Sequence, residues 1–272
     1  GATVNRFAIG FIVGVAMGAG GLFFAERYAG RGSDRARPEM VYMTTNHAPV
    51  LRTTRVLRAD VFARGAGRSN LLFRYIETRE RGDDGATISA VYTGTDGVVA
   101  AREDARIDSD GTFRSYELHQ DQLGAYGRMN RTNEKIDFLY AENGKTNRDD
   151  EDVPDRFVVG PTLFEFLGAR WSEILSGETV KARVAVVSRC ETFGFKFRMT
   201  TDHPASASNL VVEMKPSGAL VALALHSLYI IVAPDGSELR RYEGIAPLYR
   251  RVDDKKWEPL EVEMVRVEPP PT

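Results

Sequence analysis

The sequence predicts a mainly β protein, with one N-terminal transmembrane helix followed by an antiparallel curved sheet or partly closed β-barrel and one packed amphipathic helix. Three observations lead to this fold class. One apolar run without a charge lies near the N-terminus, at residues 7–25. From about residue 50, short β-branched and aromatic segments alternate with Asn-Gly and Asp-Gly pairs, which is typical of strands joined by tight hairpins. A single later segment, 163–175, has apolar residues at helical spacing.

The composition is that of a folded protein and excludes several classes. The chain has 272 residues, of which 43% are hydrophobic and 27% charged, and its formal net charge is −2. A charge this close to zero provides no general field for DNA or RNA, so we expect no nucleic-acid partner. The one cysteine, Cys190, cannot form an intrachain disulfide or a CxxC pair.

The first element is the expected membrane anchor, residues 1–29. Its span, residues 7–25, has nineteen residues without a charge between Arg6 and Glu26. At about 1.5 Å per residue, such a helix crosses the roughly 30 Å hydrocarbon core of a bilayer. A cleaved signal peptide is the alternative, but no A-x-A cleavage site ends the run.

Glycines in the span suggest that the anchor packs against other helices. Gly10, Gly14 and Gly18 recur at every fourth position, and Gly21 lies near the same face of the expected helix. Such a face lets another helix approach closely, as in small-xxx-small pairs. We therefore expect the lipid bilayer and other integral membrane subunits as partners. The simpler alternative is that glycine is common in membrane helices.

The location expected from this anchor is a bacterial inner membrane, crossed once. Four arginines, Arg27, Arg31, Arg35 and Arg37, come directly after the span, and by the positive-inside rule they favour a cytoplasmic domain. Bacterial proteins with a span at the extreme N-terminus, however, usually export the domain that is attached to it. We expect the periplasmic side, with the cytoplasmic side as the alternative.

The soluble part begins after a linker, residues 30–49, and consists of a β-rich domain, residues 50–267, with a tail at 268–272. Turn pairs such as Asp96-Gly97 and Asn143-Gly144 separate its first strands. The strands expected there are 71–78, 87–93, 112–119 and 135–140.

Later strands alternate between an apolar and a charged face, which is the pattern of half-buried strands. Lys181 and Arg183 oppose the first apolar face, and Lys196 and Arg198 oppose the second. The apolar faces consist of Val180, Ala182, Val184 and Val186, then Phe193, Phe195, Phe197 and Met199, and finally Leu260, Val262 and Met264. The phenylalanine row either packs in a core or lines a lipid-binding cavity. The apolar run 219–233 is expected to form a buried strand pair or a short helix.

One helix should interrupt the strands and close the core of the sheet. Pro161 suits a first helical position and Gly177 an end. The apolar stripe of this helix consists of Leu163, Phe164, Leu167, Trp171, Ile174 and Leu175.

No constellation of catalytic or metal-binding residues stands out. The four histidines lie far apart, and the acidic cluster at 149–155 lacks the spacing of a calcium loop, so we interpret it as a solvated loop. The sequence contains no nucleophile elbow, phosphate-binding loop or dinucleotide motif. His226 is expected to be a core histidine and Cys190 an inert buried thiol on a strand. We therefore expect no catalytic residues, no bound metal, no cofactor and no enzymatic activity.

The C-terminal half resembles a group of uncharacterised bacterial proteins of the cell envelope. The resemblance rests on WSEILSGE at 171–178, on Ser188-Arg189 with TFGF at 192–195, and on RYEG at 241–244. It covers about residues 155–265. Proteins of this group are similar in layout to the half-barrels of lipoprotein carriers. The resemblance implies the same curved sheet here, and it carries over no catalytic residues.

These observations favour a non-catalytic accessory subunit of a larger membrane protein complex, held by its glycine-rich helix and stabilising the assembly with its β domain. The alternative is an anchored envelope protein that binds a lipid or another apolar ligand in its half-barrel. An enzyme is a third hypothesis, supported only by carboxylates without a recognisable spacing.

Overall fold

The computed structural model describes residues 53–218, 225–253 and 256–268, and within them the chain folds as one large curved sheet. The expected anchor and linker lie outside these residues, as do 219–224 of the apolar run and all of the tail but Glu268. Among the helices of the described residues, none is long and apolar enough to cross a membrane.

The sheet has fifteen strands in these residues, in the order β8-β7-β6-β5-β4-β3-β2-β1-β15-β14-β13-β12-β11-β10-β9. The first wing consists of β1 (Thr53–Ala63), β2 (Phe73–Gly82), β3 (Gly85–Gly94), β4 (Val99–Asp108), β5 (Phe113–Gln120), β6 (Ala125–Arg131), β7 (Lys135–Glu142) and β8 (Lys145–Asp152). The second wing consists of β9 (Phe157–Val158), β10 (Val180–Val186), β11 (Glu191–Met199), β12 (Leu210–Pro216), β13 (Leu228–Val232), β14 (Leu239–Arg251) and β15 (Trp257–Arg266). The helical segments are η3 (Gly160–Thr162), α2 (Leu163–Ala169), α3 (Trp171–Leu175), η4 (Val187–Arg189) and η5 (Pro204–Ala207).

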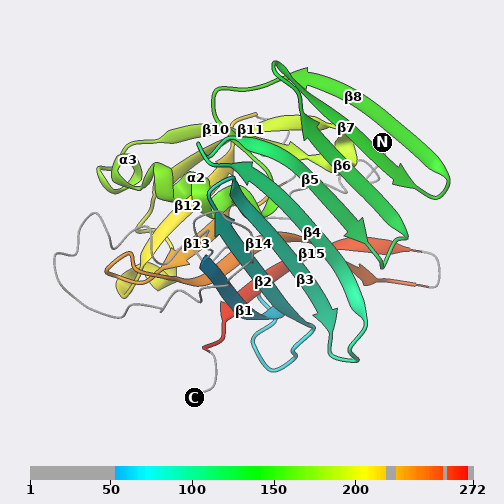
Figure 1. Cartoon of the computed structure of the whole chain (residues 1–272). Helices are drawn as coiled ribbons and strands as arrows, with labels where there is room; N and C mark the ends of the chain where they lie inside the picture. The colour runs from blue at the N-terminus through cyan, green and yellow to red at the C-terminus, as the bar shows by residue number, and fades with distance from the viewer. Residues whose placement is uncertain (1–52, 219–224, 254–255, 269–272) are drawn as a thin grey trace, which may run out of the picture.

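All strand pairs are antiparallel except β9 with β10, and the wings join where β1 pairs with β15. The two edge strands, β8 and β9, are only four residues apart in the sequence, and β8 also contacts β11 of the second wing, so the sheet curls back on itself (Figure 1). Glu151 of β8 bridges this seam, because its carboxylate accepts hydrogen bonds from the Thr192 backbone N (3.0 Å) and Oγ1 (2.5 Å) on β11. The predicted curved antiparallel sheet is therefore confirmed.

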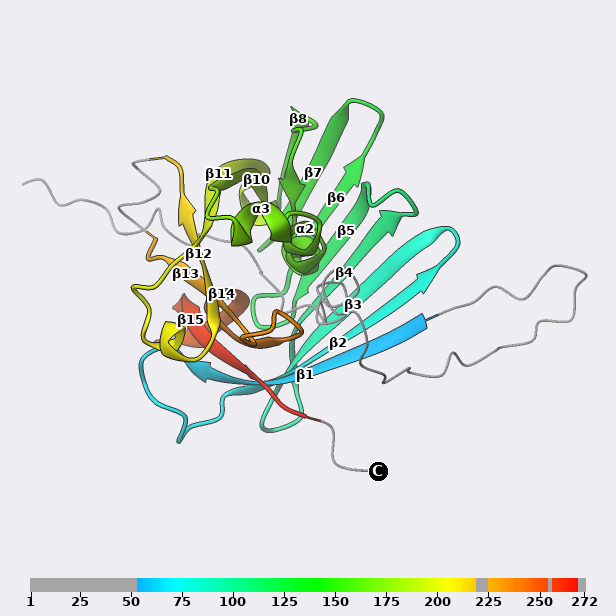
Figure 2. The same ribbon diagram turned by 90° about the vertical axis from the view of Figure 1, so that its left-hand side faces the viewer.

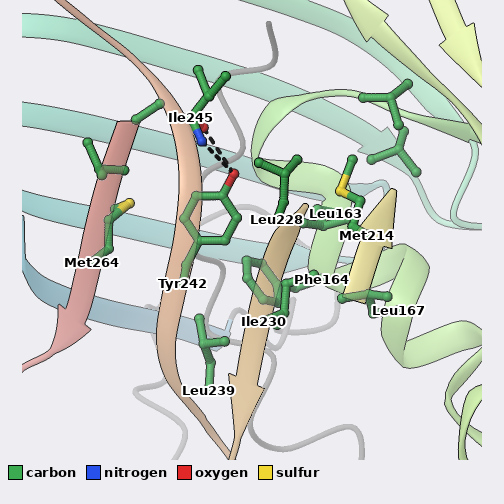
Figure 3. Packing of buried hydrophobic residues seen from close by; sticks show 14 of the residues in the cluster. Leu163, Phe164, Leu167, Met214, Leu228, Ile230, Leu239, Tyr242, Ile245 and Met264 are labelled. Carbon is green, nitrogen blue, oxygen red and sulfur yellow. Dashed lines mark hydrogen bonds between the residues drawn. The ribbon is translucent and has the colours of Figure 1, made fainter. Parts of the chain in front are cut away.

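Helices α2 and α3 lie in the concave face, between the two wings (Figure 2). Leu163, Phe164 and Leu167 of α2 are buried in the main core with Trp171 and Ile174 of α3. Figure 3 shows Leu163 and Leu167 close to Met214, Leu228 and Ile230 of the second wing. The helical segment thus closes the core as predicted.

The predicted single helix is in fact two short helices. The backbone breaks at Arg170, with φ −115° and ψ 11°, and Pro161 lies in the preceding 3-10 turn η3 and not in α2. Gly177 ends α3 with φ +88°, as expected, but Leu175 at the end of the stripe is 42% exposed. A residue with non-helical ψ interrupts the hydrogen bonds of a continuous helix, and the sequence stripe runs across this break without a sign of it.

The predicted strands 71–78, 87–93, 112–119 and 135–140 correspond to β2, β3, β5 and β7. The described part of the apolar run 219–233 forms one strand, β13. The phenylalanine row belongs to the core, because Phe195 and Phe197 are fully buried and Phe166 of α2 packs against Phe197 with ring centroids 5.3 Å apart.

The sequence suggested that the acidic cluster is a solvated loop, and this prediction is wrong. Asp149, Asp150, Glu151 and Asp152 form the second half of β8, paired with β7 from Lys135 to Glu142. The Asn143-Gly144 turn sets this pairing, since both residues have positive φ. A charged strand is tolerated because it lies at the sheet edge, where charges also discourage pairing with another chain.

Candidate functional site

The first wing buries charged residues on its inner face. Along β2, Tyr75, Glu77 and Arg79 occupy alternate positions and are 0%, 0% and 5% exposed. The neighbouring inner positions on β3 and β4 include Tyr92 and Glu103, both fully buried. A buried polar group destabilises the fold unless it is hydrogen-bonded, so the partners of these side chains define the site.

Glu103 is the centre of the buried network. The Tyr116 hydroxyl donates to its Oε1 (2.7 Å) and the Tyr92 hydroxyl donates to its Oε2 (3.2 Å). Burial raises the pKa of Glu103 to about 8, because the two tyrosine hydrogen bonds that lower it are outweighed, and the charge of Glu77 raises it further. At neutral pH the protonated form of this carboxyl therefore predominates.

Tyr75 connects Glu103 and Tyr92 to the second buried carboxylate. Its hydroxyl donates to Glu77 Oε2 (2.8 Å), and its ring lies 4.8 Å from that of Tyr92 between centroids. Burial, followed by the nearby carboxylates, raises the pKa of both tyrosines well above the usual value. Both phenols therefore stay protonated and act as hydrogen-bond donors.

Arg79 links this network to helix α2. Its guanidinium forms an ion pair with Glu165 of α2, lies 3.5 Å from Glu77 Oε1 and donates to the Pro161 carbonyl (3.5 Å). Arg81 also reaches Glu165 (3.3 Å). Arg79 Nε is buried and has no hydrogen-bond partner among the described residues. The N-terminal half of α2 is therefore held on β2 by charges as well as by apolar contacts.

The buried tyrosine of the second wing, Tyr242, is hydrogen-bonded to the backbone and to no carboxyl group of the described residues. The Tyr242 hydroxyl on β14 donates to the Ile245 carbonyl (3.0 Å) and accepts from the Ile245 N–H (3.2 Å), as Figure 3 shows. At Gly244, a Cβ would lie 2.3 Å from the Tyr242 hydroxyl oxygen, so only glycine fits there. Burial raises the pKa of Tyr242 as well, but this phenol fixes an irregular stretch of backbone through its two hydrogen bonds to Ile245.

The buried network is closed to a substrate in this conformation. Glu77, Tyr92 and Glu103 have no exposed surface. A cavity beside the network, lined among others by Tyr116, Gln120 and Val159, has a volume of about 30 Å³. This volume suits one or two water molecules, whereas small-molecule sites occupy several hundred Å³. Within the described residues, these groups are positioned to hold protons and to fix α2 in place.

The residues predicted as helix-packing sites, Gly10, Gly14, Gly18 and Gly21, lie outside the described residues, so their role stays a prediction. No group of three histidine, cysteine or acidic side chains in the described part could hold a metal ion. Sequence reasoning named no cofactor site and no catalytic residue, and both expectations remain predictions.

Two single-residue predictions are corrected. His226 is not a core histidine: its side chain is 80% exposed and its Nδ1 lies 2.9 Å from Glu261 Oε1. It lies before β13, outside the apolar strand that the sequence suggested. Cys190 is buried as expected, and burial raises the pKa of its thiol. It lies not on a strand but at a left-handed position after η4, with φ 55°.

Sequence reasoning missed the buried network. The signal for Glu103 was present, because Ala101, Glu103, Ala105 and Ile107 alternate with charged residues and form an apolar face with one carboxylate. On β2 both faces of the strand are polar, so alternation there does not tell which face is buried.

No protein-family model matches this chain, and a comparison with curated proteins gives no match. Among solved structures, the chain is similar to a β-barrel-like protein of the domain of unknown function DUF1849 from Brucella abortus. The two chains are 10% identical with a TM-score of 0.48, and the similarity covers 78% of this chain and 95% of the other.

Proposed function

We propose that this protein is a non-catalytic accessory subunit of a larger bacterial membrane protein complex. In this proposal, residues 7–25 anchor the chain in the inner membrane, and the β domain stabilises the assembly from the periplasmic side. The observation that carries the proposal is the closed interior of the domain, in which the ionisable side chains Glu77, Glu103 and Arg79 are buried. Tyrosine hydroxyls bond both carboxyl groups, and Arg79 is paired with Glu77 and with Glu165 of α2.

A packed interior supports a structural role because it leaves the outer surface as the part of the domain that meets other molecules. An acid or base in catalysis needs a reactant within hydrogen-bond reach. In the ligand-binding alternative, the phenylalanine row would line a cavity. In the structure, Phe166 of α2 packs against Phe197 of this row as part of the core. The glycine face at Gly10, Gly14 and Gly18 supports the membrane partners of the proposal. A helix that only tethers a domain does not need a face on which another helix can pack closely.

The test is native purification of the full chain followed by mass spectrometry of the complex. We expect integral membrane proteins to co-purify in stoichiometric amounts with the wild type. The triple variant Gly10→Leu, Gly14→Leu, Gly18→Leu fills the glycine face with apolar groups, so it should still insert but lose these partners.

The matched control is Ala8→Leu, Ala16→Leu, Gly20→Leu, which enlarges three small residues on the opposite face of the expected helix. The control should retain the partners. A wild-type chain that purifies alone, or partners that survive the glycine triple variant, would contradict the proposal.

One observation favours the alternative, a binding site for a lipid or another apolar ligand. Four of the buried positions of β3 and β4 are alanines, namely Ala86, Ala90, Ala101 and Ala105, and both strands contact η3. Because Arg79 and Arg81 hold α2 partly through Glu165, displacement of α2 would open a trough over these alanines. Glu165→Gln should then increase the binding of a fluorescent fatty acid to the full chain. Equal binding by the variant and the wild type would contradict this alternative.

A further inference from the structure

Three lysines form a straight row on the outer face of the second wing. Lys181 on β10 is directly opposite Lys196 on β11, and Lys196 is directly opposite Lys215 on β12. Like charges at directly opposite positions of neighbouring strands destabilise a sheet. The row lines an open groove of about 440 Å³ together with Thr179, Arg198 and Glu213.

Only one end of the row is neutralised. Lys215 Nζ lies 2.6 Å from Glu213 Oε1, and Arg198 Nη2 lies 2.9 Å from Glu213 Oε2. Burial raises the pKa of Glu213, but the hydrogen bonds from Lys215, Arg198 and Ser227 outweigh it and lower the pKa, so this carboxylate is ionised. Lys181 and Lys196 are exposed and form no ion pair within the described residues. The groove therefore carries four cations and one anion.

The choice of lysine in this row is itself informative. The chain has 29 arginines and seven lysines, and three of the seven lysines are in this row. Arginine is the residue that protein interfaces favour, and lysine is depleted there. Lysine is a compact, strongly hydrated point charge that binds phosphate without the planar geometry of a guanidinium. The row thus suits hydrated phosphate groups better than the surface of a protein partner.

We propose that this lysine row binds the phosphates of anionic lipid headgroups, so that the outer face of β10–β12 lies on the membrane surface. Neighbouring strands are about 4.8 Å apart, so the three lysines extend over about 10 Å of sheet. An open row of this kind meets a surface with many phosphates better than it encloses one ion. Each lysine near an anionic leaflet strengthens binding about fivefold. The inference rests on the membrane location proposed above, but not on partner subunits.

The experiment measures amine labelling of each lysine in the full chain by mass spectrometry. The chain is held in a non-ionic maltoside detergent, with phosphatidylglycerol or an equal amount of phosphatidylcholine added. We expect phosphatidylglycerol to slow labelling of Lys181 and Lys196 about fivefold or more. Lys145 and Lys256, which lie outside the row, should label equally with both lipids. Because detergent replaces any partner subunits, the result does not depend on the proposed complex.

Lys196→Glu separates binding from folding. It places a carboxylate between Lys181 and Lys215, so we expect the lipid-dependent protection of Lys181 to disappear while Tm rises by about 1–4 °C. The matched control Lys145→Glu, on β8, should retain the protection.

Three results would overturn the inference. The first is equal labelling of Lys181 and Lys196 with both lipids. The second is full protection by inorganic phosphate in phosphatidylcholine, which would assign the row to a free anion. The third is protection in the native complex after the lipid has been removed, which would assign it to a protein subunit.

Discussion

The two wings of the sheet enclose the same helices with opposite chemistry. The second wing presents apolar residues to α2 and α3, such as Phe195, Phe197 and Met214, and keeps its charges on the outer face. The first wing presents Glu77 and Glu103 on its inner face. Apolar burial does not depend on protonation, whereas a buried carboxyl does. Between pH 5 and pH 8 we therefore expect the first wing to make the stability of the fold depend on pH and the apolar core of the second wing to contribute equally.

The largest expected effect is the pH dependence that Glu103 gives to folding. Its pKa in the folded protein is about 8, raised by burial above the ordinary 4.5, so the folded state binds the proton more tightly than the unfolded state. The contribution to stability is fully present below pH 4.5 and is lost as pH rises towards 8. Up to about 5 kcal/mol of the free energy of unfolding depends on pH in this way.

Glu103→Gln tests this directly, since an amide cannot ionise. Urea unfolding at pH 5 and pH 8 should show a much smaller decrease for the variant than for the wild type. Glu117→Gln is the control, because Glu117 is exposed on the neighbouring strand β5. If the stability of Glu103→Gln depends on pH as strongly as that of the wild type, the pH dependence of the first wing does not come from this carboxyl.

The second prediction concerns the apolar wing. Phe197→Ala removes a fully buried ring that packs against Phe166, and it should lower the free energy of unfolding by about 3–5 kcal/mol. Because no titratable group is lost, the decrease should be equal at pH 5 and pH 8 in the same urea experiment. A decrease that changes with pH would mean that the two wings do not contribute independently.

The sequence predicted the second wing better than the first, and the comparison explains why. In β10 and β11, alternation such as Phe193, Phe195 and Phe197 against Lys196 and Arg198 marks the inner face directly. In β2, the inner residues are as polar as the outer ones, so the alternation does not indicate which face of the strand is buried. Turn residues still placed β2 and β3, because Gly85 (φ +128°) and Gly97 (φ +86°) mark the ends of hairpins.

Tertiary context decided the features that sequence reasoning missed. β8 is a strand because β7 offers it a partner, although residues 145–152 have low strand propensity. The helical stripe does not encode the break at Arg170, because its apolar spacing continues across the break from Leu167 to Trp171. The buried network needs Glu103, Tyr116 and Glu77 from three strands at once, and local patterns do not specify such a combination.

The smallest expected effect concerns a contact that joins the wings. Gly127 on β6 of the first wing faces Val187 of η4, and a Cβ at Gly127 would lie 2.8 Å from Val187 Cγ1. Gly127→Ala should therefore cost about 1–3 kcal/mol of the free energy of unfolding through overpacking. Val187→Ala removes both methyl groups that the new Cβ would meet, so the double variant should be more stable than the sum of the two single changes predicts. The coupling energy from urea unfolding measures this, since residues in contact deviate from additivity by about 0.5 kcal/mol or more. Additive changes would mean that the wings move apart to admit the methyl group, and that the seam is held by Glu151 and Thr192 and not by close packing at Gly127.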